Sequence, residues 1–323
     1  MAELRWNPIL GEWVIVADVR QDRPVLPRDS CPLCPGGLEV PRDYYIVSFE
    51  NRFPSLERAP KAPSIKGDDL YRVRRNRGVC EVLLYTSEHE LAPSQLDLSR
   101  MEDLVEVWVD RHTELSKHDF VKYVFIFENR GEVIGVTLSH PHGQIYAFPF
   151  IPPLIRRELR RAKLYYKRKG KCLFCEVLRR ERASGARIIY ENEGFIAFVP
   201  FYARFPYEVH LYPKEHVLDL RDLGEDQRRE LALSIKVILQ KYDGLFDEEF
   251  PYMMIFHQAP VDGKDYSYYH FHVEFYSVKR GKDKVKYLAG VESGAGTFIL
   301  DLSPERMAQD LRGVKTELEL ELN

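Results

Sequence analysis

The chain carries the same three motifs twice in the same order, and this repetition constrains its fold more than any other feature. The segment from Val82 to His89 aligns without gaps on the segment from Val209 to His216. A Cys-x-x-Cys pair precedes each segment, and a His-x-His triplet follows it, at His140-Pro141-His142 and His270-Phe271-His272. Chance repeats one motif more easily than three in order. We therefore infer an internal duplication with an offset of roughly 130 residues.

The pattern of apolar residues predicts an α+β chain of two similar domains. Its 323 residues suffice for two hydrophobic cores. Each half contains strands, then an amphipathic helix, then strands, which favours antiparallel sheets with helices packed on them over a parallel fold. We expect helices over 100–117, 153–169 and 224–242, and a further helix from Ser303-Pro304 onward. Ser99 and Glu102 form a capping box at the first helix, and Gly170 closes the second. The expected strands are 121–127, 132–138, 142–148, 205–212, 252–257 and 269–276.

A domain boundary is expected within the basic helix 153–169, which gives an N-terminal domain at 1–160 and a C-terminal domain at 161–323. The formal net charge is −3, which does not suggest nucleic-acid binding. The N-terminus lacks the apolar run of a signal peptide, and no segment reaches the roughly 18 to 20 apolar residues that span a bilayer. We expect a cytoplasmic protein with neither nucleic-acid nor membrane partners.

Four of the five cysteines form two close pairs, which in a long intracellular chain indicates metal binding rather than disulfides. Zinc takes about four sulfur or imidazole ligands in a tetrahedron. One such set is Cys31, Cys34, His89 and His140, and its repeat is Cys172, Cys175, His216 and His270. A competing set in the second half suits iron or zinc, in a structural role, and consists of Glu158, His257, His270 and His272. Redox cysteines and buried core histidines are the alternatives to metal sites.

His142 is the candidate nucleophile. It shares one face of a predicted strand with Gln144, because residues two apart on a strand point the same way. A neutral imidazole attacks phosphorus well near pH 7, and an amide donates to phosphate oxygens without adding charge. Nearby glycines would let backbone N–H groups approach phosphates: Gly131, Gly135 and Gly143. The alternatives for His142 are a metal ligand or a buried core histidine.

The segments Phe127-Glu128-Asn129-Arg130-Gly131 and His140-Pro141-His142-Gly143-Gln144 resemble the active-site signature of the galactose-1-phosphate uridylyltransferase family, within the histidine-triad superfamily. The resemblance covers most of the chain. It implies a duplicated histidine-triad-like fold and a ping-pong exchange: UDP-glucose uridylylates His142, and galactose 1-phosphate then takes up the uridylyl group. It also implies a homodimer whose active sites are completed by the neighbouring subunit.

The resemblance also assigns residues. The first Cys/His set matches the family's zinc ligands. Arg20 and Arg23 match arginines that contact phosphate. Lys286, Tyr287 and Glu292 resemble the segment that reaches the sugar phosphate across the dimer. The positions that match the nucleotide site are Asn51, Asn129, Gly135, Thr137 and Gln144.

Some positions depart from the family pattern. Arg52 stands where bacterial members have Asp, and Val291 and Phe298 stand where Tyr and Gln are usual near the hexose. The second Cys-x-x-Cys is similar to one found in a related branch, the ADP-glucose phosphorylases, which have two zinc sites. Adenylyl transfer or phosphorolysis of ADP-glucose is therefore an alternative activity, although that branch has Ser in place of Pro141 and of Gly143. A non-catalytic, zinc-organised nucleotide-binding module is a third interpretation.

Overall fold

The protein is described by a computed structural model covering residues 2–22, 31–246 and 248–321. Its centre is a single nine-stranded sheet in the order β3-β5-β7-β6-β11-β12-β10-β9-β8, in which every pairing is antiparallel. The first half supplies β3 (Val47–Glu50), β5 (Val79–Leu84), β6 (Tyr123–Arg130) and β7 (His142–Phe148). The second half supplies β8 (Ile188–Glu191), β9 (Phe195–Phe198), β10 (Val209–Pro213), β11 (Tyr252–His257) and β12 (His272–Tyr276).

The two halves are joined at the middle of this sheet, where β6 pairs with β11 and Phe127 lies opposite Ile255. Going outward from this junction, the strands of each half follow one another in equivalent order. The predicted α+β fold is therefore confirmed, with the sheets of the two halves merged into one.

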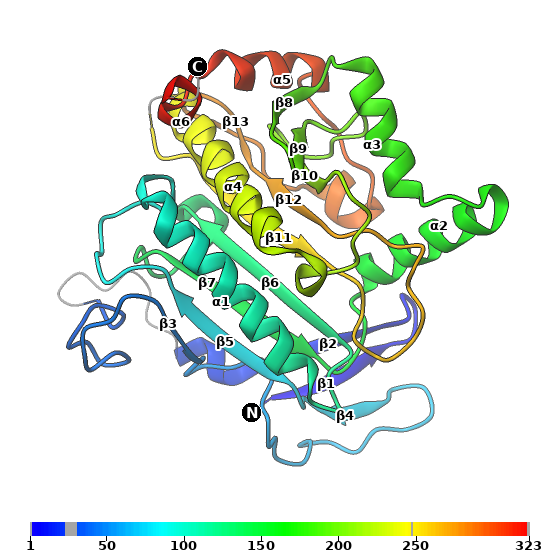
Figure 1. The fold of residues 1–323 in the computed structure, drawn as a ribbon. Coiled ribbons are helices and arrows are strands. Elements are labelled where there is room, and N and C mark those ends of the chain that lie inside the picture. Colours follow the sequence, from blue (N-terminus) through cyan, green and yellow to red (C-terminus); the bar gives the residue numbers. More distant parts are fainter. Residues whose placement is uncertain (1, 23–30, 247, 322–323) are drawn as a thin grey trace.

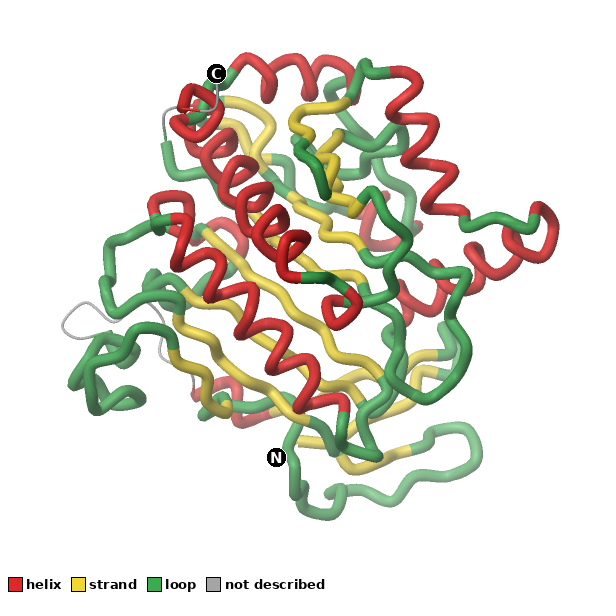
Figure 2. Tube along the Cα trace, in the orientation of Figure 1, coloured by secondary structure: helices red, strands yellow, loops and turns green. Residues whose placement is uncertain are grey.

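Helices α1 (Leu98–Ser116) and α4 (Glu225–Phe246) pack against each other and cover one face of the sheet (Figures 1 and 2). Their apolar sides and the sheet residues that face them form the largest core cluster, which includes Trp108, Leu104 and Ile235. The other face of the sheet is where His142 and Gln144 point, because the intervening Gly143, Ile145 and Ala147 are buried toward the helices.

Smaller elements surround this centre. Near the N-terminus, β1 (Ala2–Asn7), β2 (Glu12–Ala17) and β4 (Val73–Arg75) form a three-stranded sheet. The second half adds α2 (Pro153–Lys169), α3 (Leu173–Ser184), α5 (Pro304–Gly313), α6 (Glu317–Glu321), β13 (Lys279–Gly281) and β14 (Lys284–Val285). Among the described residues, no helix combines the length and the apolarity needed to cross a bilayer.

Most predicted elements are confirmed with shifted ends. Gly170 closes α2 with a left-handed φ of 64°, and the Ser303 side chain caps α5 by accepting from the Arg306 N–H. Helix α1 begins earlier than predicted, because Asp97 and not Ser99 caps it. The strand predicted at 132–138 is wrong: a short helical turn, Glu132–Ile134, stands there between Gly131 and Gly135. Both glycines have left-handed φ angles, 97° and 85°, which a β-strand does not contain.

Candidate active site and metal sites

His142 begins β7 and is held by a hydrogen bond to its own motif. Its Nδ1 lies 2.7 Å from the carbonyl oxygen of His140. A carbonyl can only accept, so Nδ1 carries the proton and the lone pair of the neutral ring is on Nε2. This tautomer is the one a nucleophilic imidazole needs.

Two hollows meet at His142. One, of about 310 Å³, is lined by Asn129, Arg130 and Pro141 among others. A smaller one, of about 30 Å³, is lined by Asn51, Phe53, Thr137 and Gln144 as well as His142. The structure thus brings five sequence-predicted residues to one place around this ring: Asn51, Asn129, Thr137, Gln144 and His142 itself.

Arg20 lies beside the same strand, because its guanidinium donates to the Tyr146 hydroxyl on β7 (3.3 Å) and to Ser55 Oγ (3.1 Å). Tyr146 is two residues beyond Gln144 and shares its face. Gly135 serves the turn after β6 and lines neither hollow. Arg23 lies outside the described residues.

The segment predicted to reach the sugar phosphate does not join this site within one chain. Lys286 pairs with Glu292 at 3.2 Å, and Tyr287 is 58% exposed. None of the three lines a hollow at His142. Their predicted contact needs a second subunit and stays a prediction.

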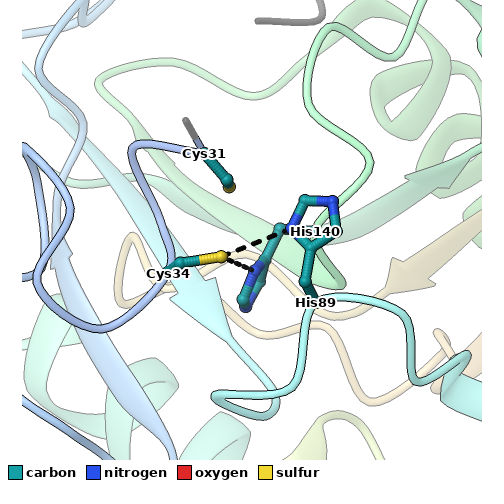
Figure 3. A group of neighbouring side chains, drawn as sticks. All are labelled: Cys31, Cys34, His89 and His140. Atoms are coloured by element: carbon teal, nitrogen blue, oxygen red, sulfur yellow. Dashed lines mark hydrogen bonds between the residues drawn. The ribbon is translucent and has the colours of Figure 1, made fainter. Parts of the chain in front are cut away.

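The first Cys/His set forms a compact group with all four ligand atoms within 4.8 Å of one another. Figure 3 shows both rings turned toward Cys34, whose Sγ lies 3.4 Å from His89 Nδ1 and 3.6 Å from His140 Nδ1. The Nε2–H of His140 donates to the Thr86 carbonyl at 2.8 Å, which leaves the Nδ1 lone pair facing the thiols. Burial and the neighbouring Cys31 raise the pKa of Cys34 to about 11, so a cation is needed to hold the thiolate form.

The repeated set is built in the same way. Cys175 Sγ lies 3.3 Å from Nδ1 of both His216 and His270. The Nε2 atoms of these rings face backbone carbonyls of Ser267 and Pro213, at 3.0 and 3.2 Å. The ligand atoms of Cys172, Cys175, His216 and His270 again lie within 4.8 Å. Both groups have the donor set of tetrahedral zinc.

In the competing set of the second half, His270 lies with the cysteine group, and Glu158, His257 and His272 lie together as a separate group. Both histidines of this separate group are buried, and Glu158 is half-buried. Sequence reasoning missed its fourth member, Glu274, whose carboxylate lies 3.3 Å from His272 Nε2 and 3.8 Å from His257 Nε2. Glu274 is two residues after His272 on β12, and this spacing could have signalled it.

The atoms of this separate group suit a proton or a metal ion between them. The Nδ1–H of His272 donates to the His270 carbonyl at 2.9 Å, so its Nε2 lone pair faces the Glu274 carboxylate. A ring nitrogen lone pair and a carboxylate oxygen repel each other unless a proton or a metal ion lies between them. Burial lowers the pKa of His257, but Glu158 and Glu274 outweigh this and raise it to about 9. The group therefore fits either a divalent metal or an imidazolium–carboxylate cluster.

The known proteins that resemble this chain cover it almost end to end. Residues 1–152 match a family model described as "Galactose-1-phosphate uridyl transferase, N-terminal domain", and residues 158–320 match the corresponding C-terminal domain. A galactose-1-phosphate uridylyltransferase of Thermotoga maritima is 52% identical, over 98% of this chain and 100% of that protein. The enzyme of the same name from Haemophilus influenzae is 33% identical, over 96% of this chain and 93% of that protein.

Solved structures also resemble this chain over nearly its whole length. One described as "Structure of uridylyltransferase" has a TM-score of 0.87 at 34% identity, covering 96% of this chain and 97% of that chain. An ADP-glucose phosphorylase from Arabidopsis thaliana with bound ADP-glucose has a TM-score of 0.75 at 25% identity, covering 98% of this chain and 99% of that one.

The fold and the repeated His-x-His motif define a duplicated histidine-triad-like protein. Within that class, the chain belongs to the galactose-1-phosphate uridylyltransferase family.

Proposed function

We propose that this protein transfers a uridylyl group from UDP-glucose to galactose 1-phosphate through a covalent intermediate on His142. The observation that carries the proposal is the hydrogen bond from His142 Nδ1 to the His140 carbonyl, which directs the lone pair of Nε2 away from the backbone at a point where two hollows meet. Family membership and the relatives' names support the choice of substrates.

In the first step, Nε2 of His142 attacks the α-phosphorus of UDP-glucose. The bond from this phosphorus to the bridging oxygen breaks, and glucose 1-phosphate leaves with the electron pair. The proton stays on Nδ1 and keeps its hydrogen bond to the His140 carbonyl, which stabilises the positive charge that develops on the ring. Gln144 and Arg20 would contact phosphate oxygens.

In the second step, a phosphate oxygen of galactose 1-phosphate attacks the same phosphorus, and the phosphorus–nitrogen bond breaks. UDP-galactose is released, and His142 regains its lone pair. Asn51 and Phe53, which line the smaller hollow, would contact the base of the uridine, because an aromatic ring beside an amide suits a base. The larger hollow, lined by Asn129, would receive the sugar phosphates.

The metals we assign are structural. Zinc fits each Cys₂His₂ group, and the first one fixes His140, whose carbonyl orients His142. The group of Glu158, His257, His272 and Glu274 would hold iron or another divalent ion, given its oxygen and nitrogen donors. Metal analysis of Cys172→Ser and His257→Ala should show separate losses of one zinc and one second metal.

We further propose a cytoplasmic homodimer with domains at 1–160 and 161–323. The exposed Tyr287, beside the Lys286–Glu292 pair, would then reach the sugar phosphate in the neighbouring subunit. A variant Tyr287→Ala should raise the KM for both UDP-glucose and hexose 1-phosphate, because each places a hexose phosphate in the same site.

A second candidate, adenylyl transfer, is supported by the likeness to the ADP-glucose phosphorylase. Incubation with UDP-glucose or ADP-glucose, followed by intact-mass measurement, separates the two. We expect a uridylyl adduct on the wild type and none on His142→Gly. An adduct with ADP-glucose alone selects the second candidate, and no adduct with either sugar nucleotide contradicts both.

A further inference from the structure

Polar side chains lie inside the apolar core behind β7, on the side of the sheet opposite the reactive histidine. Glu128 on β6 pairs with Gly143 on β7, directly after His142. Its side chain shares a face with Val124 and Ile126, which belong to the core beneath α1, and the residue is only 3% exposed. A carboxyl group there costs stability relative to an apolar side chain of the same size.

Two tyrosines contact this carboxyl group. The Tyr252 hydroxyl, from β11 in the second half, donates to Glu128 Oε1 at 2.5 Å. The Tyr85 hydroxyl interacts with the same carboxyl group. Oε2 is buried and has no further hydrogen-bond partner among the described residues. Burial raises the pKa of Glu128 to about 7.

Tyr85 supports the backbone on both sides of His142. Its hydroxyl lies directly against Gly143, where an added Cβ would collide with it. Its backbone N–H points at the carbonyl of Pro141, 3.4 Å away. Tyr85 therefore contacts the residue before and the residue after the reactive histidine. The close approach of this hydroxyl requires a glycine at position 143, whereas its φ angle is not left-handed.

The second half lacks these polar groups at the equivalent place. There the residue after His272 is Val273, and its partner on the neighbouring strand is Phe256. The duplicated scaffold thus folds with an apolar pair where the first half has Glu128 and Gly143. Polar groups at this place in the first half, beneath a histidine that lines two hollows, indicate a role in that histidine's chemistry rather than in folding.

We propose that Glu128 and Tyr85 are positioning residues, which hold the His142–Gly143 backbone from the far side of the sheet so that Nε2 stays in line with the α-phosphorus. This inference rests on the proposed function of His142. Since neither side chain reaches the substrate, their loss should lower the rate of uridylylation and leave nucleotide affinity unchanged.

The test compares Tyr85→Phe, Glu128→Leu and Glu128→Gln with a matched control, Tyr242→Phe. Tyr242 is a buried tyrosine of the same core cluster whose hydroxyl donates to the Tyr207 carbonyl at 2.7 Å. Single-turnover uridylylation by UDP-glucose is followed by quenching and intact mass, and affinity is measured with UDP. Tyr85→Phe and Glu128→Leu should slow the step by about 10- to 100-fold with unchanged UDP affinity.

Glu128→Gln keeps an oxygen that accepts from Tyr252 and should recover most of the rate, and Tyr242→Phe should react at the wild-type rate. Wild-type rates in both Tyr85→Phe and Glu128→Leu would overturn the inference, as would equal slowing in Tyr242→Phe. If Glu128→Leu fails to fold, Tyr85→Phe, which only removes an oxygen, still decides. A wild type that forms no adduct would instead refute the proposed function of His142.

Discussion

The two halves of this protein contain the same arrangement around one histidine, but this histidine lines two hollows in the first half and is buried in the second. His142 and His272 each follow a histidine of a Cys₂His₂ group by two residues, and each donates from Nδ1 to that histidine's carbonyl, at 2.7 and 2.9 Å. His142 lines two hollows, whereas His272 is 1% exposed and packs against Phe174 and Tyr212, with ring centroids 5.0 and 4.8 Å away. Duplication kept the scaffold, and the surroundings decide whether the ring can react.

The neighbouring positions have also diverged. Gln144 pairs with Phe127, and its counterpart two residues after His272 is Glu274, which pairs with Ile255. An amide can donate to a phosphate, but a carboxylate repels it and favours a cation instead. The same duplicated framework thus carries an amide that suits an anion in the first half and a carboxylate that suits a cation in the second.

Replacing each of the two histidines by alanine should give the largest difference in activity. His142→Ala should lower uridylyl transfer by about 10³-fold or more, because the covalent intermediate is lost. His272→Ala should leave the rate per folded molecule within a few fold of the wild type. Steady-state rates, normalised to folded protein by circular dichroism, check both. Equal losses in the two variants would break the comparison.

Placing the second half's carboxylate in the first half should give the next largest effect. Gln144→Glu brings negative charge beside the phosphates and removes a donor, so we expect about a 10²-fold loss in kcat/KM. Gln144→Asn, which keeps the amide on a shorter side chain, serves as control and should lose less. The comparison requires the charged variant to be the worse of the two.

The two Cys₂His₂ groups should respond differently to the loss of a ligand. Cys31→Ser and Cys172→Ser should each lose about one zinc per chain by metal analysis. Only Cys31→Ser should also lose roughly tenfold or more in activity, since its group fixes the carbonyl that orients His142. Full activity in Cys31→Ser would show that the metal does not position the nucleophile.

The smallest effect concerns stability and pH. The pKa of Glu128 is about 7 in the fold, against 4.5 as its ordinary value. The folded state then holds more protons than the unfolded state between these values, so this group's contribution to stability falls as pH rises from 4.5 to 7. The charged groups around it are Arg130 and Asp243, and Tyr85 and Tyr252 contact it.

Glu128→Gln should remove this dependence. The free energy of unfolding of this variant and of the wild type is measured with denaturant at pH 5 and pH 7.5. The variant's advantage over the wild type should be larger at pH 7.5 than at pH 5, by about 3 kcal/mol at most. Phe256→Leu, at the equivalent place in the second half, should change stability by the same amount at both pH values.

Local patterns predicted much of this molecule. Alternation and helix spacing predicted most elements, and the repeated Cys, His and His-x-His motifs predicted that the side chains of both Cys₂His₂ groups lie together. The turn at Glu132–Ile134 was missed because its apolar residues resemble a strand, while the two glycines around it set the backbone.

Contacts between distant segments could not be derived from one sequence. The ungapped alignment matches Leu84 with Leu211, but in the sheet Leu83 pairs with Gly143 and Leu211 with Val273, so the strands correspond one residue away. Such a slip exchanges the faces of a strand. It places Tyr85 in the core beneath α1 and Tyr212 beside His272, which explains why the two halves differ around their histidines.

A crystal structure of the protein after reaction with UDP-glucose would test the covalent intermediate on His142 directly. We predict continuous density from His142 Nε2 to the phosphorus of a uridylyl group, with uracil beside Asn51 and Phe53 and His272 unmodified. A uridylyl group on any other residue, or a His142 ring coordinated to a metal ion, would contradict it.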